Sequence, residues 1–171
     1  MSEVTYRRAE ASDAAALAEL AASTFVQTFA HLYPREDLDA YLAKSYGAAI
    51  QRDEIEDETV ATWLAHRGAE LIGYAQAGPM DMKVDHAPTD RELYRLYVTG
   101  DAKGAGVAHQ LMRVVVDWAR EQGAPSLWLS VWENNERAQR FYRRYGFEHV
   151  GEHKFMVGNT ADRDFIWRLT L

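Results

Sequence analysis

The 171-residue sequence predicts a single mixed α/β (α+β) domain, residues 1–171, with the element order β-ααα-ββ-β-α-β-α-ββ. Short alternating segments, typical of strands, are interleaved with segments whose apolar residues recur at helical spacing. Glycine and proline fall between these segments and mark their ends. The length is close to the roughly 150 residues of one domain, and no proline-rich linker divides the chain.

The first third of the chain predicts one strand and three helices. Residues 4–8 alternate in polarity and predict a strand. An alanine-rich run with helical periodicity follows to about residue 30, with Ser12 as its expected N-cap and Asp13 in its first turn. Proline 34 then separates it from a helix near residues 35–44, and a third helix is expected at about residues 48–56.

The middle third predicts three strands. Residues 59–66 and 70–77 read as a hairpin because Arg67-Gly68-Ala69 joins them. Residues 79–90 contain two prolines and mixed polarity, so we expect a loop. Residues 92–98 (ELYRLYV) have the aromatic and β-branched content of a strand.

The last third alternates helix and strand and then ends in two strands. Residues 104–123 begin glycine-rich and become an amphipathic helix, followed by a strand at 126–132. Residues 136–145 predict a helix that stops at Gly146. Residues 147–157 and 164–169 complete a sheet of about seven strands flanked by helices.

Composition excludes several classes of protein. The chain has a net charge of −7, 47% hydrophobic and 26% charged residues, and no cysteine. No cysteine means no disulfide, no thiolate metal site and no cysteine nucleophile. The acidic balance argues against a nucleic-acid partner. With no apolar leader and no long apolar run, we expect no signal peptide, no membrane span and a cytoplasmic location.

The segment from Lys103 to Ala108 (KGAGVA) is the most informative in the chain because it joins a predicted strand to a predicted helix. Small residues at a helix N-terminus let a phosphate approach unpaired backbone amides. A tight turn that needs glycine only for its dihedral angles is the alternative. The spacing fits neither a Walker A loop nor a dinucleotide fingerprint, because His109 stands where the third glycine would be.

Residues 93–123 resemble the acetyl-CoA-binding motif of the GNAT superfamily of N-acetyltransferases, whose loop is Gln/Arg-x-x-Gly-x-Gly/Ala. Here Lys103 takes the Gln/Arg place. A second family motif, Asn-x-x-Ala-x-x-Phe-Tyr-x-x-x-Gly-Phe, is matched position by position from Asn135 through Tyr142 to Phe147. The resemblance implies a mixed, mostly antiparallel sheet and acetyl-CoA as co-substrate, with no metal.

The resemblance also implies which residues hold the cofactor. The strand edge at 96–98 would pair with the pantetheine arm, and the loop amides would hold the pyrophosphate. Lys103 or Arg144 could meet a phosphate charge, or could be a solvated surface cation. The expected cofactor-binding residues are Leu96, Tyr97, Val98, Lys103, Gly104, Ala105, Gly106, Val107, Ala108, Asn135, Ala138, Tyr142 and Arg144.

The expected mechanism is direct transfer of acetyl to an amine, because no cysteine can form an acyl-enzyme. A Val98 amide would polarise the thioester carbonyl. Tyr142 is the expected general acid for the thiolate, since its reference pKa of about 10 is close to that of a thiol. Packing beside Phe141 is its structural alternative. The candidates for the base are Glu92 and Tyr94, at the start of the central strand, and Glu133, beyond the neighbouring strand, and Glu92 is the one we select. An ordinary surface or packing role is the structural alternative for each.

The acceptor is expected to be a small-molecule amine. Residues 25–38, 128–133 and 151–155 resemble the bacterial spermidine/spermine N-acetyltransferase branch, which implies a polyamine. Alternatives are a protein or peptide acceptor, or a non-catalytic acetyl-CoA-binding module, and either a monomer or a homodimer is expected. Carboxylates and an aromatic wall would bind such a cation, and the expected substrate-binding residues are His31, Tyr33, Glu36, Asp37, Trp132 and Glu133.

Two histidines, His149 and His153, are four residues apart in the predicted strand 147–157. Strict alternation along that strand would place both on one face. No third ligand is evident nearby, so the sequence predicts no metal site.

Overall fold

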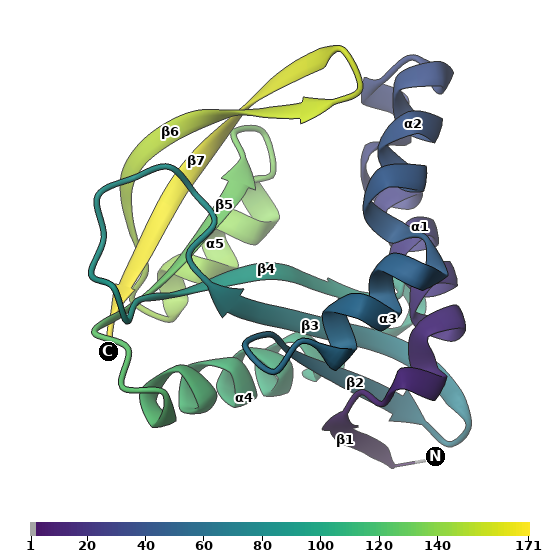
Figure 1. Ribbon diagram of the computed structural model, residues 1–171, viewed down its shortest axis with the longest axis horizontal. Coiled ribbons are helices and arrows are strands. Elements are labelled where there is room, and N and C mark those ends of the chain that lie inside the picture. Colours follow the sequence, from purple (N-terminus) through teal and green to yellow (C-terminus); the bar gives the residue numbers. More distant parts are fainter. Residues whose placement is uncertain (1–2) are drawn as a thin grey trace.

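A twisted seven-stranded sheet forms the body of the protein, in the spatial order β1-β2-β3-β4-β5-β7-β6 (Figure 1). The computed structural model describes residues 3–171. Neighbouring strands are antiparallel except β4 and β5, which are parallel. This confirms the predicted mixed, mostly antiparallel sheet. The strands are β1 Val4–Arg8, β2 Ala61–Arg67, β3 Glu70–Pro79, β4 Arg91–Val98, β5 Ser126–Trp132, β6 Glu148–Val157 and β7 Thr160–Thr170.

Helices cover both faces of the sheet (Figure 1). On one face, α1 buries Leu17 and Phe25 against Leu64 and Tyr74 of the hairpin β2–β3. The neighbouring residues of that hairpin point to the other face, where they meet the apolar side of α4. The helices are α1 Ala14–Phe29, α2 Arg35–Tyr46, α3 Ala48–Glu56, α4 Val107–Glu121 and α5 Glu136–Arg144, with short 3₁₀ turns η1 Ala11–Asp13, η2 Ala30–Leu32 and η3 Gly100–Ala102.

The predicted order of elements is confirmed, but the start of α1 differs. A 3₁₀ turn, η1, precedes the helix, and Ser12 lies inside that turn rather than at a helix cap. The Asp13 side chain caps the start of this turn instead, because the Glu10 amide donates a hydrogen bond to Asp13 Oδ2 at 2.7 Å. Arg7 of β1 also donates to Asp13, at 2.8 Å, so a contact between elements fixes this start.

Strands β4 and β5 pair only at their beginnings, through Arg91↔Leu127 and Glu92↔Trp128. Asp90, which is 3% exposed, holds this junction. Its carboxylate accepts from the Ser126 amide at 2.9 Å and from Trp128 Nε1 at 3.0 Å. Beyond this point the two strands diverge, and the cavities described below open between them.

Three register shifts interrupt the described sheet, and those in β4 and β6 decide which of the predicted residues share a face. In β4 the register shifts so that Tyr94 has no partner on β3. In β6 a shift at Val150 leaves His149 opposite Trp167 and His153 opposite Asp164. Cross-strand partners share a face, and residues 164 and 167 of β7 face opposite sides. The prediction that the two histidines share a face is therefore wrong, because the bulge reverses the alternation between them.

Within residues 3–171, no helix is long and apolar enough to span a membrane.

Candidate active site

A cavity of about 500 Å³ lies between β4, the N-terminus of α4 and the side of α5. The loop before α4 turns through Gly104 and Gly106, whose φ angles of +85° and +81° favour glycine. No side chain caps α4, so its first amides are unpaired and carry the positive end of the helix dipole. The helix start is therefore built to bind an anion.

The lining of this cavity is positively charged although the protein is acidic overall. Lys103, Arg137 and Arg144 line it, and no aspartate or glutamate does so among the residues that the structure describes. This local charge suits a polyphosphate, because close cations act more strongly than the distant net charge of the protein. His109 is held in place by the Tyr145 hydroxyl, 2.8 Å from its Nδ1.

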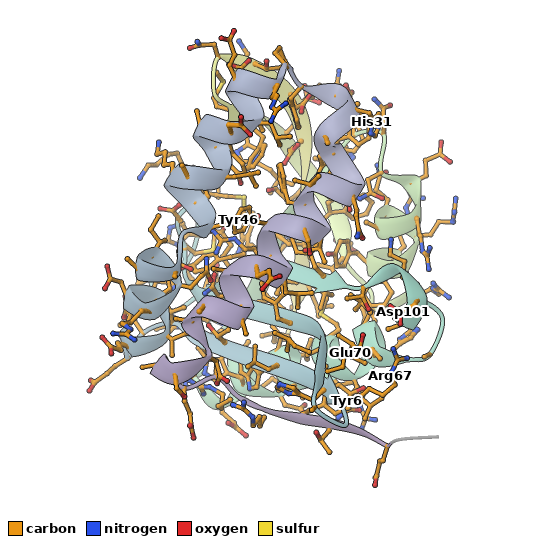
Figure 2. The ribbon with its side chains drawn as sticks, turned by 90° about the vertical axis from the view of Figure 1, so that its right-hand side faces the viewer. Tyr6, His31, Tyr46, Arg67, Glu70 and Asp101 are labelled. Atoms are coloured by element: carbon orange, nitrogen blue, oxygen red, sulfur yellow. The ribbon has the colours of Figure 1, made fainter. Side chains whose placement is uncertain are left out.

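The segment that leads into the glycine loop is tied to the hairpin β2–β3, at the end of the sheet where β4 finishes. Arg67, at the end of β2, forms an ion pair with Asp101 of η3 at 2.5 Å and with Glu70 at 3.2 Å. Figure 2 shows the three side chains gathered at this corner of the molecule. The pairs fix the turn from which the loop enters α4.

The edge of β4 offers backbone groups to the cavity. The Thr99 amide donates to Ile72 O of β3 at 2.9 Å. Amide directions alternate along an extended strand, so the Val98 amide points away from β3, into the gap beside β5. Leu96, Tyr97 and Val98 line the cavity there, as the sequence predicts.

Helix α5 forms the other wall. Asn135 is its N-cap, with Oδ1 accepting from the Ala138 amide at 3.2 Å. The side-chain amide of Asn135 keeps its N–H groups for a ligand. The tyrosine ring of the second motif, Tyr142, packs edge-on to Phe141 and Phe147. Burial raises the pKa of the Tyr142 phenol above its usual value, so the hydroxyl is protonated at neutral pH.

Twelve of the thirteen residues predicted to hold the cofactor line this one cavity, and Ala105 does not. Ala105 lies at the exposed turn of the loop. The sequence analysis did not predict five residues of the cavity wall. Four of them lie within one helical turn of a predicted residue, so their position in the chain could have identified them, and the fifth lies on α1. They are Thr28, Ala102, His109, Arg137 and Phe141.

A second cavity, of about 150 Å³, lies on the other side of the divergence between β4 and β5. Leu96, Tyr97, Asn135, Ala138 and Tyr142 line both cavities, so the two meet at these residues. Its remaining wall is mostly aromatic, from α1, α2 and the strands. The aromatic residues are Phe25, Phe29, Tyr33, Tyr41, Tyr46, Tyr94, Trp132 and Phe155.

Asp164 of β7 also lines the second cavity and is 7% exposed. Burial, with the nearby charges of Asp162 and Glu133, raises the pKa of Asp164 to about 7, and a Ser130 hydrogen bond opposes the shift. Neither sequence motif reaches this residue. The available signal was a carboxylate directly before the apolar run Phe165-Ile166-Trp167 of the predicted strand 164–169.

A third, wider cavity of about 830 Å³ adjoins the second, sharing Tyr41, Tyr94, Arg95, Ser130 and Phe155 with it. We call it the outer cavity. Carboxylates outnumber cations on its wall: Lys83 and Arg95 face Glu54, Asp57, Asp81, Glu92 and Glu152.

Glu92 lies in the outer cavity, and its carboxylate is already engaged. Oε2 accepts from the Asp81 amide at 2.7 Å and from the Met82 amide at 3.1 Å. Burial raises the pKa of Glu92, and these two hydrogen bonds lower it. The arrangement anchors the loop between β3 and β4. It places Glu92 away from the residues at which the first two cavities, here called the inner cavities, meet.

Only two of the six predicted substrate-binding residues, Tyr33 and Trp132, line the second cavity. His31 is exposed in η2 (Figure 2), and Glu36 is exposed at the start of α2. Neither lines any of the three cavities. The expected grouping fails because the periodicity of α2 directs Glu36 to solvent.

Asp37 and Glu133 have partners outside the cavities. Asp37 accepts from the Asn159 amide at 3.1 Å and from the Thr160 hydroxyl. It thereby ties α2 to the tip of the hairpin β6–β7, which reaches that helix in Figure 1. Glu133 lies 3.5 Å from Arg163. Both carboxylates hold strands and helices together.

No group of three or more His, Asp or Glu side chains in the described part of the chain is placed to hold a metal ion.

A helix start with unpaired amides and nearby cations, beside the free edge of β4 and next to a second cavity, suits an acyltransferase that binds coenzyme A. Residues 16–147 match the model of the Acetyltransferase (GNAT) family, and the chain belongs to this family. It is an enzyme, an N-acetyltransferase with acetyl-CoA as co-substrate.

Curated relatives cover nearly the whole chain. An uncharacterized N-acetyltransferase of Mycobacterium bovis is 30% identical over 155 residues, covering 91% of this chain and 96% of the relative. Another, of Lactobacillus delbrueckii subsp. lactis, is 28% identical over 149 residues and covers 86% of each.

Solved structures share the fold. The PaiA N-acetyltransferase of Thermoplasma acidophilum, in complex with coenzyme A, has a TM-score of 0.81 at 19% identity over 99% of both chains. A ribosomal-protein-alanine N-acetyltransferase of Brucella melitensis has a TM-score of 0.69 at 23% identity, covering 98% of this chain and 99% of that one.

Proposed function

We propose that the enzyme transfers acetyl directly to a primary amine of a small cationic molecule, with a polyamine such as spermidine or spermine as the specific candidate. The observation that carries this proposal is the meeting of two unlike cavities at Tyr142. One has cations on its wall and suits the polyphosphate of coenzyme A. The other has aromatic rings and the Asp164 carboxylate, and suits an ammonium group.

In the proposed mechanism the chain holds the two substrates together and stabilises charge. Amides of Gly104 and Gly106 through Ala108 bind the pyrophosphate, and the Val98 amide faces the thioester oxygen as an oxyanion donor. Holding both reactants in one site supplies much of the rate. Tyr142, kept protonated by its raised pKa, donates a proton to the departing thiolate.

The charge of the outer cavity supports an acceptor with more than one ammonium group. Arg95 is neutralised there by Glu54, 3.0 Å away, and stacks on the Tyr46 ring at 4.7 Å. The other carboxylates on the wall leave it acidic overall. If one amine of a polyamine occupies the second cavity, the ammonium group at its other end would lie in this acidic outer cavity.

A peptide acceptor is the second candidate, favoured by the width of the outer cavity. At about 830 Å³ it could admit a main chain as well as a flexible polyamine. Relatives of the fold include an enzyme named for a ribosomal-protein alanine. Membership of the acetyltransferase family sets aside the non-catalytic acetyl-CoA-binding module that the sequence left as the alternative of another class.

An acceptor panel tests the proposal by thiol release from acetyl-CoA. Spermidine, spermine, aminoglycosides and short peptides are compared at one pH. The matched pair is 1,4-diaminobutane and butylamine, which differ in the distal ammonium. We expect polyamines to turn over, with a lower KM for the diamine than for the monoamine. Turnover of peptides alone would favour the second candidate, and turnover of no amine would refute the proposal.

A further inference from the structure

Asp164 is a buried carboxylate that faces the acceptor side of the site. The strand registers place it opposite Trp132 of β5 and opposite His153 of β6. It lines the second cavity, of about 150 Å³, together with Tyr142, and it is 7% exposed. It therefore lies close to where a reacting amine must sit.

Asp164 has no cationic partner within residues 3–171. Arg95, the cation on the same cavity wall, points to Glu54 and to Gln76 Oε1 at 2.8 Å. A buried, unpaired carboxylate is costly unless a cation completes the site. The acceptor ammonium is the cation that the reaction brings.

We propose that Asp164 binds the acceptor ammonium and takes its first proton, so that the neutral amine attacks the thioester. This inference rests on the proposed function and assigns the base that the reaction needs. Glu92 is the weaker choice, because two backbone amides occupy its Oε2 and it lies in the outer cavity.

The steps balance as follows. One N–H bond of the ammonium breaks, and the proton moves to an Asp164 oxygen. The nitrogen lone pair forms a C–N bond to the acetyl carbon, and the carbonyl oxygen takes the negative charge beside the Val98 amide. As the C–S bond breaks, the sulfur receives the Tyr142 proton. The nitrogen sheds its second proton, which restores Tyr142, and Asp164 returns its own to solvent.

The surroundings of Asp164 set its protonation. Titratable and charged side chains from several elements line the cavity of Asp164, raise its pKa or feel its charge. They are Tyr33, Tyr41, Tyr46, Tyr94, Arg95, Tyr97, Glu133, Tyr142, His153 and Asp162. Burial lowers the pKa of His153 below its usual value, so the imidazole is neutral at pH 7 and adds no positive charge beside Asp164. With the pKa of Asp164 at about 7, the active carboxylate form is gained as pH rises through 7.

The test compares wild type with Asp164→Asn, measuring kcat/KM for the amine against pH. Wild type should rise through about pH 7 and then level off. The variant depends on amine that is already neutral, about one part in a thousand at pH 7.5 for a Lys-like pKa of about 10.4. We expect a loss of about 10²–10³-fold at pH 7.5, with a rate that keeps rising tenfold per pH unit to pH 9.

A weakly basic amine separates proton removal from a structural role. An acceptor whose conjugate acid has a pKa well below 7 is already neutral, so the variant should turn it over within about threefold of wild type. Equal losses on both kinds of amine, or a retained rise near pH 7 in the variant, would overturn the assignment. Calorimetry with acetyl-CoA, with unchanged affinity expected, shows that the variant is folded.

Asp162→Asn is the matched control on the same strand. The Asp162 charge raises the pKa of Asp164, so its removal should move the rise in kcat/KM to lower pH without lowering the plateau. An unmoved rise would count against Asp164 as the group that titrates. If wild type acetylates no amine at all, the proposed function itself fails. If it acetylates amines and both variants behave as wild type, only this inference fails.

Discussion

Replacing Tyr142 by phenylalanine should slow thiol release and leave the fold intact. The ring lies between Phe141 and Phe147, with centroid distances of 5.5 and 5.7 Å, and phenylalanine keeps both contacts. Tyr142 lines both inner cavities, and its hydroxyl makes no hydrogen bond within the described part of the chain. We therefore expect the free energy of unfolding to change by less than about 1 kcal/mol.

The expected loss of activity is about 10–100-fold in kcat. General acid catalysis typically contributes about 10²–10⁴-fold. The lower end applies here because a thiol, with a reference pKa of about 8.5, leaves readily as the anion. Because burial raises the pKa of Tyr142, wild type should show no loss of activity from this group up to pH 9.

The assay is thiol release under saturating acetyl-CoA, with calorimetry for cofactor affinity. Tyr6→Phe is the control, since Tyr6 lies on β1, at the sheet edge three strands from β4 (Figure 2). An unchanged kcat in Tyr142→Phe would refute the role of Tyr142 as acid and would favour a packing role. A large fall in stability would show that the hydroxyl has a structural partner.

Three further changes test other parts of the site. Asp81→Asn removes a carboxylate from the outer cavity and should raise the KM for a diamine several-fold. Asp85→Asn changes a residue of the same loop that lies outside the cavity and should leave this KM unchanged; steady-state kinetics of both variants test the prediction. Gly106→Ala should cost about 1–2 kcal/mol of stability because φ is +81°, and weaken coenzyme A binding by moving the loop amides, seen by thermal unfolding and calorimetry. Asp90→Ala should lower the free energy of unfolding by about 3–5 kcal/mol, because buried donors at Ser126 and Trp128 lose their acceptor; equal urea midpoints for wild type and variant would contradict this.

The cofactor side of the site was predictable because its signals are local. Glycines at two required backbone angles, the start of an amphipathic helix and the Asn135 cap all lie within short stretches of chain. Each works through backbone geometry that its own neighbours determine. A motif there therefore specifies position as well as identity.

The acceptor side was less predictable, because it is assembled from strands and helices far apart in sequence. The sequence analysis expected Asp37 to bind a cation, but its carboxylate accepts hydrogen bonds from Asn159 and Thr160 and so joins α2 to the hairpin β6–β7. Asp164 carried no prediction beyond its place in the strand 164–169, and it lies in the cavity that Tyr142 also lines. Whether a carboxylate is solvated, paired or unpaired depends on residues that are close in space but distant in sequence, and a local sequence pattern does not identify them.

By itself the sequence determined the α/β class, the order of its elements and the glycine turn before α4, since periodicity and glycine placement act over a few residues. The tertiary structure decided the rest. The parting of β4 and β5 after Glu92, the bulges at Tyr94 and Val150, and the buried Asp164 all follow from how strands align with one another. A shift of one residue in that alignment moves a side chain to the other face of the sheet, and only the folded chain fixes it.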